Sequence, residues 1–209
     1  MNTKAKSKLP HRPFHQGWTI VAVVSLALAA CAPQTSVPAE PPLAGADIGG
    51  PFDLVNSAGE PVTWEDFRGQ YAVIYFGYAY CPDVCPTDMQ RTAQGMRIFA
   101  DEAPERAANT QVAFISIAPA RDTPEVVGEF AAAFSDDIIG LTGTPETVKS
   151  AADAFRVYYK LGEPAPGGGY LGDHTNIVYL FDPDGEPLAM LPTSEGADAV
   201  ASELDKWVN

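Results

Sequence analysis

The sequence predicts an α/β domain with a central mixed β-sheet flanked by helices. Two nearly continuous apolar runs, at residues 71–78 and 112–117, have the length and the β-branched and aromatic content of buried strands. Thr-Pro-Glu occurs at 123–125 and at 144–146, and each copy places a capping hydroxyl before a proline at the first helical position. Buried strands that alternate with such helices indicate a layered α/β architecture.

The elements of the first half follow from turn and proline chemistry. Residues 52–55 and 61–63 flank the turn sequence Asn-Ser-Ala-Gly, which predicts a small hairpin. A short helical turn is expected at 64–67. The buried strand at 71–78 leads into two cysteines, after which Pro86 suits the first turn of a helix that runs to about residue 100.

The second half predicts further helices and a closing hairpin. The turn sequence Asp-Pro-Asp-Gly at 182–185 separates two apolar segments, as in a strand hairpin. After the strand at 112–117, the expected elements are helices from 124 and from 145 to 155, a short strand at 156–160, a loop at 164–169, strands at 176–181 and 186–191, and a helix at 194–208. This order of elements fits a thioredoxin-like fold.

The composition is that of an acidic globular protein. The chain has 209 residues, of which 46% are hydrophobic and 19% charged, and its formal net charge is −14. Four of the basic residues lie before residue 31 in a stretch without acidic residues, so the remainder is more acidic still. Such a charge repels phosphate backbones and excludes nucleic-acid binding as a function. Solubility explains the acidity better than an acidic docking face does.

The N-terminal residues predict an export signal that ends in a lipidated cysteine. A basic segment at 1–17 precedes an apolar run at 18–32, shorter than the ~20 residues of a membrane-spanning helix. The run contains Leu-Ala-Ala-Cys, which resembles a bacterial lipoprotein box and predicts a lipid on Cys31. An uncleaved signal anchor is the alternative. Both interpretations predict an exported domain that is held at a membrane and faces the periplasm.

These patterns divide the chain into three segments. Residues 1–31 form the signal and anchor. Residues 32–50 are rich in Pro, Ala and Gly and are expected to be a flexible linker. Residues 51–209 form the folded domain.

Cys81 and Cys85 are the strongest candidates for chemistry. They lie between a buried strand and a helix, and a spacing of four places both on one side of that helix. The partial positive charge of a helix N-terminus favours thiolates, which are both nucleophiles and soft metal ligands. The spacing is one residue longer than Cys-x-x-Cys, which permits a disulfide and also leaves room for an ion. A buried structural disulfide is the alternative.

His174 is the third candidate, because it is the only histidine after residue 15 and lies just before the strand at 176–181. In thioredoxin-like chains this segment packs against the cysteine loop. Oxidoreductases of that fold carry a cis-proline here, whereas this chain has Asp173-His174-Thr175. An ordinary surface or core histidine is the alternative interpretation.

Two thiolates and one imidazole favour copper as the metal. Soft sulfur ligands select Cu(I), zinc or iron–sulfur clusters. Structural zinc prefers a fourth ligand and clusters need more cysteines, and neither is available in the sequence. Asp173 is either an outer partner of the histidine ring or a turn cap. Met89 and Met96 are expected to belong to the core.

Several stretches together resemble the Sco/SenC family of copper chaperones, from about residue 51 to the C-terminus. The matching stretches are Tyr75-Phe76-Gly77-Tyr78, Cys81-Pro82-Asp83-Val84-Cys85-Pro86, Ser116-Ile117, Arg121-Asp122-Thr123-Pro124, Gly140-Leu141-Thr142-Gly143-Thr144, Tyr158-Tyr159, Asp173-His174 and Tyr179-Leu180-Phe181-Asp182-Pro183-Asp184-Gly185. The resemblance implies a thioredoxin-like fold and one copper ion, Cu(I) or Cu(II), held by Cys81, Cys85 and His174. It also implies delivery of copper to the CuA centre of cytochrome c oxidase subunit II.

The chain departs from the family pattern at Ala118 and Ala120, where relatives carry Asp and often Glu. A metallochaperone, which is not an enzyme, requires a thiol reductant as a further partner, because a disulfide cannot bind the metal as thiolate. The main alternative is a thiol–disulfide oxidoreductase in which Cys81 attacks an exported partner and Cys85 resolves the mixed disulfide. A copper or redox sensor that transfers no metal is the third hypothesis.

Overall fold

The structure is a computed structural model that describes residues 40–163 and 171–209. The predicted signal and anchor, Cys31, the first part of the linker and the whole predicted loop at 164–169 lie outside these residues. Across the described ranges, no helix is long and apolar enough to cross a membrane.

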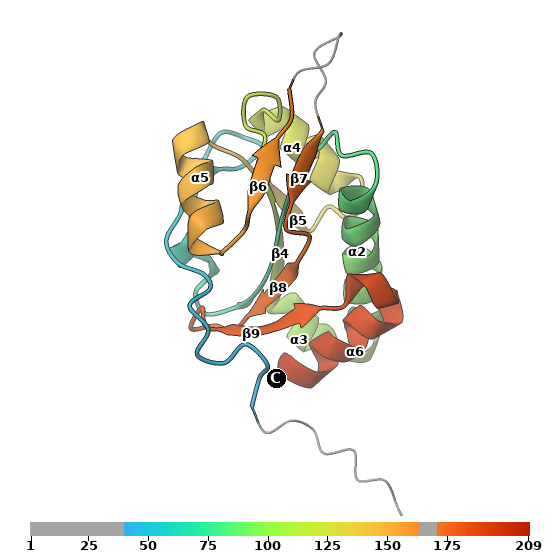
Figure 1. Cartoon of the computed structure of the whole chain (residues 1–209). Coiled ribbons are helices and arrows are strands. Elements are labelled where there is room, and N and C mark those ends of the chain that lie inside the picture. Colours follow the sequence, from blue (N-terminus) through green and yellow to red (C-terminus); the bar gives the residue numbers. More distant parts are fainter. Residues whose placement is uncertain (1–39, 164–170) are drawn as a thin grey trace, which may run out of the picture. The chain divides into compact units, whose positions relative to one another are not determined.

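A five-stranded mixed sheet forms the centre of the domain, in the order β5-β4-β3-β8-β9, and confirms the predicted sheet (Figure 1). Its strands are β3 (Tyr71–Gly77), β4 (Thr110–Ser116), β5 (Ile138–Leu141), β8 (Val178–Phe181) and β9 (Pro187–Leu191). The strands β3, β4 and β5 are parallel, whereas β8 and β9 are antiparallel to their neighbours. Gly77 pairs with Ser116, so the loops that follow β3 and β4 leave the same edge of the sheet.

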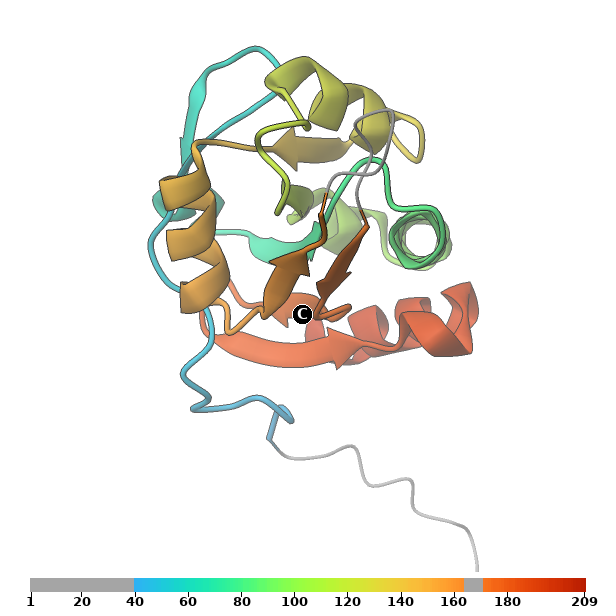
Figure 2. The ribbon, with the colours of Figure 1, turned by 45° about the horizontal axis from the view of Figure 1, so that its top comes forward.

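Helices cover the sheet on both sides. They are α2 (Val84–Glu102), α3 (Pro104–Ala108), α4 (Pro124–Ala132), α5 (Pro145–Ala154) and α6 (Ala197–Trp207). Figure 2 shows α2 in green beside α6 in red, with α5 across the strands from them. The two neighbouring helices approach closely at Gly95, where a Cβ atom would lie 2.4 Å from Val200 Cγ1.

An aromatic cluster fills the core on the side of α5. The Trp64 ring lies 5.2 Å from the Phe155 ring and 5.1 Å from the Phe181 ring, in edge-to-face contacts. Such pairs each contribute ~0.5–1.5 kcal/mol beyond the area that they bury. Trp64 belongs to the predicted helical turn, η1 (Trp64–Phe67), which follows the predicted hairpin of β1 (Asp53–Val55) and β2 (Pro61–Thr63).

Pro86 lies in the first turn of α2, as predicted, where none of the N–H groups has an intrahelical acceptor and a proline is tolerated. Other boundaries differ from the prediction. The strand expected at 156–160 is β6 (Tyr159–Leu161), since Arg156 turns the chain with a φ of 56° after α5. Strands and helices that the prediction omitted are short: α3, β5, β7 (Gly172–His174) and η2 (Thr193–Glu195).

Residues 40–50, which lie in the predicted linker, contact the folded domain. The N–H of Leu43 donates to Leu188 O, and the N–H of Gly49 donates to Ala154 O, both at 3.0 Å. Leu43 and Ile48 also pack against the core. These two apolar side chains and the backbone bonds anchor the segment.

Met89, as predicted, is fully buried in the core.

Candidate metal centre

The loop after β3 brings both cysteines under the end of the sheet. Gly77 ends β3, and a Cβ atom there would lie 2.9 Å from Cys85 Sγ and 3.1 Å from the Phe114 ring. Only glycine therefore lets the sulfur approach the strand this closely. Cys85 is the second residue of α2, and its N–H donates to Cys81 Sγ at 3.5 Å.

Both thiols are free and buried, so the structure contains no bond between Cys81 and Cys85. Cys81 is 9% exposed and Cys85 is completely buried. Cys81 is thus the more exposed of the two cysteines. This arrangement differs from the structural disulfide that the sequence left open.

His174 lies at the end of β7, which pairs with β6 to form a two-stranded ribbon in which His174 faces Tyr159. Its Nε2 atom lies 3.3 Å from Cys85 Sγ, and its Nδ1 atom lies 3.0 Å from Thr175 O. A backbone carbonyl only accepts, so Nδ1 carries the proton in this contact and Nε2 presents its lone pair to the sulfurs. Thr175 O, and not the exposed Asp173, holds the ring.

The candidate ligand atoms of Cys81, Cys85 and His174 all lie within 4.8 Å of one another. Two soft sulfurs and one neutral imidazole nitrogen in such an arrangement fit Cu(I). The structure thus brings together all three residues that the sequence singled out. In the part of the chain that the structure describes, no other group of three His, Cys, Asp or Glu side chains is arranged to hold a metal ion.

Aromatic rings enclose the imidazole. The Tyr75 ring lies 6.2 Å and the Tyr78 ring 5.9 Å from the His174 ring, both edge-to-face. Tyr75 is fully buried, and its hydroxyl donates to Asp88 Oδ2 at 3.1 Å. These contacts restrict the rotation of the ring and keep water from one side of the site.

The two thiols differ in their electrostatic surroundings. Burial raises the pKa of Cys81, but hydrogen bonds from the N–H groups of Asp83 and Cys85 and from the side chains of Cys85 and Tyr78 outweigh it and leave the pKa below its ordinary value. Burial is also the largest influence on Cys85, where it raises the pKa far above the ordinary value. In the metal-free protein Cys81 is therefore the cysteine that ionises more readily, and Cys85 the one that keeps its proton to higher pH.

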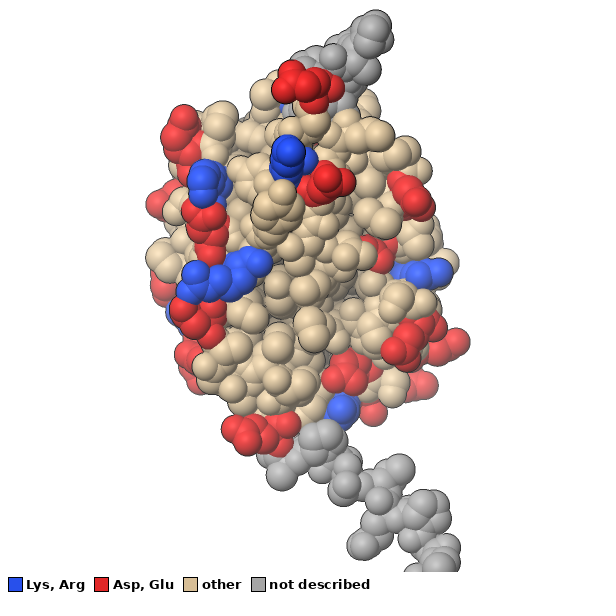
Figure 3. All heavy atoms as spheres, viewed as in Figure 1, with Lys and Arg blue, Asp and Glu red and all other residues tan. Residues whose placement is uncertain are grey.

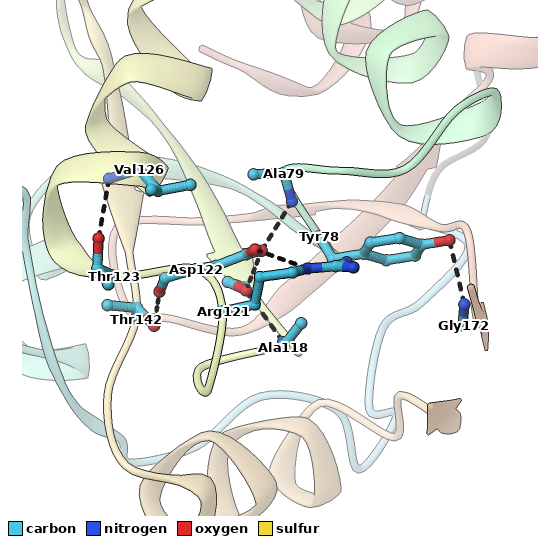
Figure 4. A network of polar contacts seen from close by, with 10 residues as sticks. Tyr78, Ala79, Ala118, Arg121, Asp122, Thr123, Val126, Thr142 and Gly172 are labelled. Atoms are coloured by element: carbon cyan, nitrogen blue, oxygen red, sulfur yellow. Dashed lines mark hydrogen bonds and ion pairs between the residues drawn. The ribbon is translucent and has the colours of Figure 1, made fainter. Parts of the chain in front are cut away.

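Sequence reasoning missed one polar network beside the site. Asp122 is completely buried, and its Oδ2 atom accepts from the N–H of Ala79 and the hydroxyl of Ser116, both at 2.7 Å (Figure 4). The sequence feature that could have indicated this network is the Arg121-Asp122 pair, which stands between a buried strand and the cap of the next helix. Ala118, where the chain departs from the family pattern, is buried nearby, and its N–H donates to Ser116 Oγ.

Much of the molecular face on which β6 and β7 lie carries no charged side chain. Below the tip of the ribbon, the middle of this face is uncharged, and most acidic side chains lie toward its edges (Figure 3). Exposed apolar side chains occur on the segments next to the candidate ligands. They are Tyr80, Val84, Tyr158 and Leu171.

Comparison with known proteins shows which sequences this chain is similar to. The SCO1/SenC family model matches residues 40–209. Protein SenC of Rhodobacter capsulatus is 45% identical over 143 residues, which are 67% of this chain and 61% of that protein. The mitochondrial SCO1 homolog of Homo sapiens is 39% identical over 159 residues, 75% of this chain and 52% of that protein.

Solved structures agree with the sequence matches. The structure of Bradyrhizobium japonicum ScoI with copper bound has a TM-score of 0.69 and 33% identity, and the match covers 77% of this chain and 99% of that one. The likeness confirms the predicted thioredoxin-like fold. The chain spans little more than half the length of the two curated relatives that it matches.

Proposed function

The chain belongs to the SCO1/SenC family, and from this premise we propose that it is a metallochaperone that binds one copper ion through Cys81, Cys85 and His174. The observation that carries the proposal is the approach of three suitable ligand atoms to within 4.8 Å of one another. A related protein of known structure, ScoI of Bradyrhizobium japonicum, has copper bound. Copper is the cargo in this function, taken up and released by the same three side chains.

The donor set is suited to release as well as to binding. Three ligands leave a position open at which an incoming ligand of a recipient protein attacks the metal, so that each ligand is replaced in turn. Cys81 is the more exposed cysteine and is the first that a recipient reaches. The protein must be kept reduced by a thiol reductant, because a disulfide between the two cysteines removes both thiolates.

The recipient that we propose is the CuA centre of cytochrome c oxidase subunit II. The resemblance of the site motifs to the copper chaperones of the Sco/SenC family supports it. The exposed apolar residues on the segments beside the site, Tyr80, Val84, Tyr158 and Leu171, provide a surface on which a protein partner can dock without desolvating charges.

Copper titration of the full chain, purified in detergent under reducing and anaerobic conditions, tests the binding site. We expect one copper ion per chain, and loss of stoichiometric binding in Cys81→Ala, Cys85→Ala and His174→Ala. Cys31→Ala is the matched control, because it removes a cysteine outside the site and keeps full binding. A wild-type titration curve for His174→Ala refutes the three-ligand site. Incubation of the loaded chain with the copper-free CuA domain, followed by metal analysis of both proteins, tests delivery.

A thiol–disulfide oxidoreductase is the second candidate, favoured by the lowered pKa of Cys81 and by the free state of both thiols. Cys81 would attack a partner disulfide and Cys85 would then release the reduced partner, leaving one disulfide in this chain. His174 distinguishes the two functions. A His174→Ala variant that still reduces an oxidised CuA domain at the wild-type rate but no longer loads it with copper separates them.

We propose further that the protein is exported and tethered by a lipid on Cys31, so that the domain faces the periplasm. The lipoprotein-like motif supports this anchor. Fractionation of cells that express Cys31→Ser tests it, since loss of the lipid releases the protein from the membrane fraction. Retention of the variant in the membrane would favour the uncleaved signal anchor.

A further inference from the structure

The candidate ligands come from two parts of the chain, the loop after β3 and strand β7, and one pair of residues contacts both parts. Arg121 and Asp122 lie in the loop after β4. This loop leaves the same edge of the sheet as the cysteine loop, because β3 and β4 are parallel and in register at Gly77 and Ser116.

Asp122 fixes the start of the cysteine loop. Its Oδ2 atom accepts from the N–H of Ala79, two residues before Cys81, and from Ser116 at the end of β4. Its backbone carbonyl accepts from Thr142 Oγ1 at 2.9 Å, a bond in which the carboxylate takes no part. The carboxylate is 0% exposed, so its bonds are made without competition from water.

Arg121 contacts the rings on either side of Ala79. Its guanidinium carbon lies 5.5 Å from the centre of the Tyr78 ring and 4.9 Å from the centre of the Tyr80 ring. Its Nε atom also lies 3.8 Å from Asp122 Oδ1. Figure 4 shows the guanidinium group beside the Tyr78 ring. Contacts of this kind are attractive, because the negative face of the ring meets the positive guanidinium group.

Tyr78 carries the contact on to the histidine strand. Its hydroxyl accepts from the N–H of Gly172, the first residue of β7, at 3.1 Å. Its ring packs edge-to-face on the His174 ring. A continuous chain of contacts thus runs from Asp122 through Arg121 and Tyr78 to β7.

We propose that Arg121 and Asp122 form a positioning pair that holds the cysteine loop and strand β7 at the spacing that one metal ion requires. The pair touches neither the metal nor a ligand atom and acts through Ala79 and Tyr78. This inference rests on the proposed copper site. Groups that orient ligands in this way typically change metal affinity by ~10–100-fold when they are removed.

Hydrogen exchange on the reduced, metal-free full chain in detergent tests the pair without copper. Arg121→Leu removes the contacts to Tyr78 and Tyr80 at a position 18% exposed, and Asp122→Asn removes the buried charge. We expect faster exchange of the backbone amides at 79–85 and at 172–174 in both variants. Unchanged exchange at 172–174 overturns the coupling of the two parts.

Thr142→Val is the matched control, because it removes a hydrogen bond to Asp122 but leaves its carboxylate in place. We expect it to lower the unfolding temperature and to leave exchange at 79–85 and 172–174 at the wild-type rate. Faster exchange in this variant at both segments means that general destabilisation is sufficient, and it overturns the proposal.

Competition with a chromophoric Cu(I) chelator gives the second readout. We expect Arg121→Leu to lower the Cu(I) affinity by ~10–100-fold and Thr142→Val to leave it unchanged. When Tyr78→Phe is already present, Arg121→Leu should lower the affinity by a smaller factor. Additive losses in this double-mutant cycle, or wild-type affinity in Arg121→Leu, overturn the pair's role. If the wild-type chain binds no copper, the proposed function fails, and the exchange experiment still decides the coupling.

Discussion

His174 Nε2 lies 3.3 Å from Cys85 Sγ, although 89 residues separate the two in the chain. The contact joins the start of α2 to the end of β7, which belongs to a separate two-stranded ribbon outside the central sheet. The site is therefore a property of the folded chain. Changes that shift either element by a small distance are expected to alter metal binding before they unfold the protein.

Gly77→Ala should weaken the site by steric pressure on a ligand. The added Cβ would lie 2.9 Å from Cys85 Sγ, and such overpacking typically costs ~1–3 kcal/mol of unfolding free energy. Gly95→Ala is the control, since its Cβ would press on Val200 between α2 and α6, away from the sulfurs. Denaturant unfolding should show losses in both variants, and copper titration a loss only in Gly77→Ala. Equal copper affinity in the two variants contradicts the steric account.

The two thiols should react at different pH. The pKa of Cys81 is below, and that of Cys85 above, the ordinary thiol value, with burial opposing the shift at Cys81 and causing it at Cys85. As pH rises, Cys81 therefore becomes a thiolate before an ordinary thiol does, and Cys85 stays protonated beyond that range. Alkylation of the reduced, metal-free protein, followed by peptide mass spectrometry, should label Cys81 first. Earlier labelling of Cys85 would be incompatible with these surroundings.

Tyr78→Phe should reduce copper affinity through the loss of a hydroxyl that bonds to both Gly172 and the Cys81 thiol. The variant leaves the N–H of Gly172 without its acceptor, at a cost of ~0.5–1.5 kcal/mol. Tyr71→Phe is closely matched, because the Tyr71 hydroxyl also accepts a backbone N–H, that of Asn209, at 3.1 Å. Thermal unfolding should shift by similar amounts in both, whereas competition with a Cu(I) chelator should detect a loss only for Tyr78. A loss of the same size in Tyr71→Phe would show that general stability controls binding.

Phe155→Ala should destabilise the fold without acting on the ligands directly. Phe155 is fully buried and contacts Trp64, Phe76 and Phe181, so its truncation is expected to cost ~3–5 kcal/mol. Equilibrium unfolding in urea measures this loss. The fraction that remains folded should still bind one copper ion per chain, and a folded fraction that binds none would link this cluster to the site.

The sequence predicted the three candidate ligands because each had a local signal. Cys81 and Cys85 stand between a buried strand and a helix, and His174 precedes a strand that was expected beside them. The strands β3, β4, β8 and β9 were predictable for a similar reason, since continuous burial or a turn sequence marks each of them.

Other features could not be predicted, because they depend on contacts between distant parts of the chain. β7 is formed by three residues, Gly172, Asp173 and His174, whose composition does not favour a strand, and it exists through pairing with β6. The carboxylate of Asp122 could not be assigned to Ala79, because the register of β3 and β4 brings the two together. The composition likewise predicted a linker that reached residue 50. Leu43 and Ile48 instead pack against the core, on surfaces that form only when the chain folds.

The atom that holds the His174 ring is a main-chain oxygen, that of Thr175. Thr175 is itself tied to Tyr158 by its N–H and by its hydroxyl. No side-chain replacement can remove that oxygen, so a mutation cannot delete the acceptor that sets the tautomer of the imidazole. A carboxylate side chain in the same role could be lost by one substitution. Substitutions at residue 173 can therefore change the surface charge without changing the orientation of the ring.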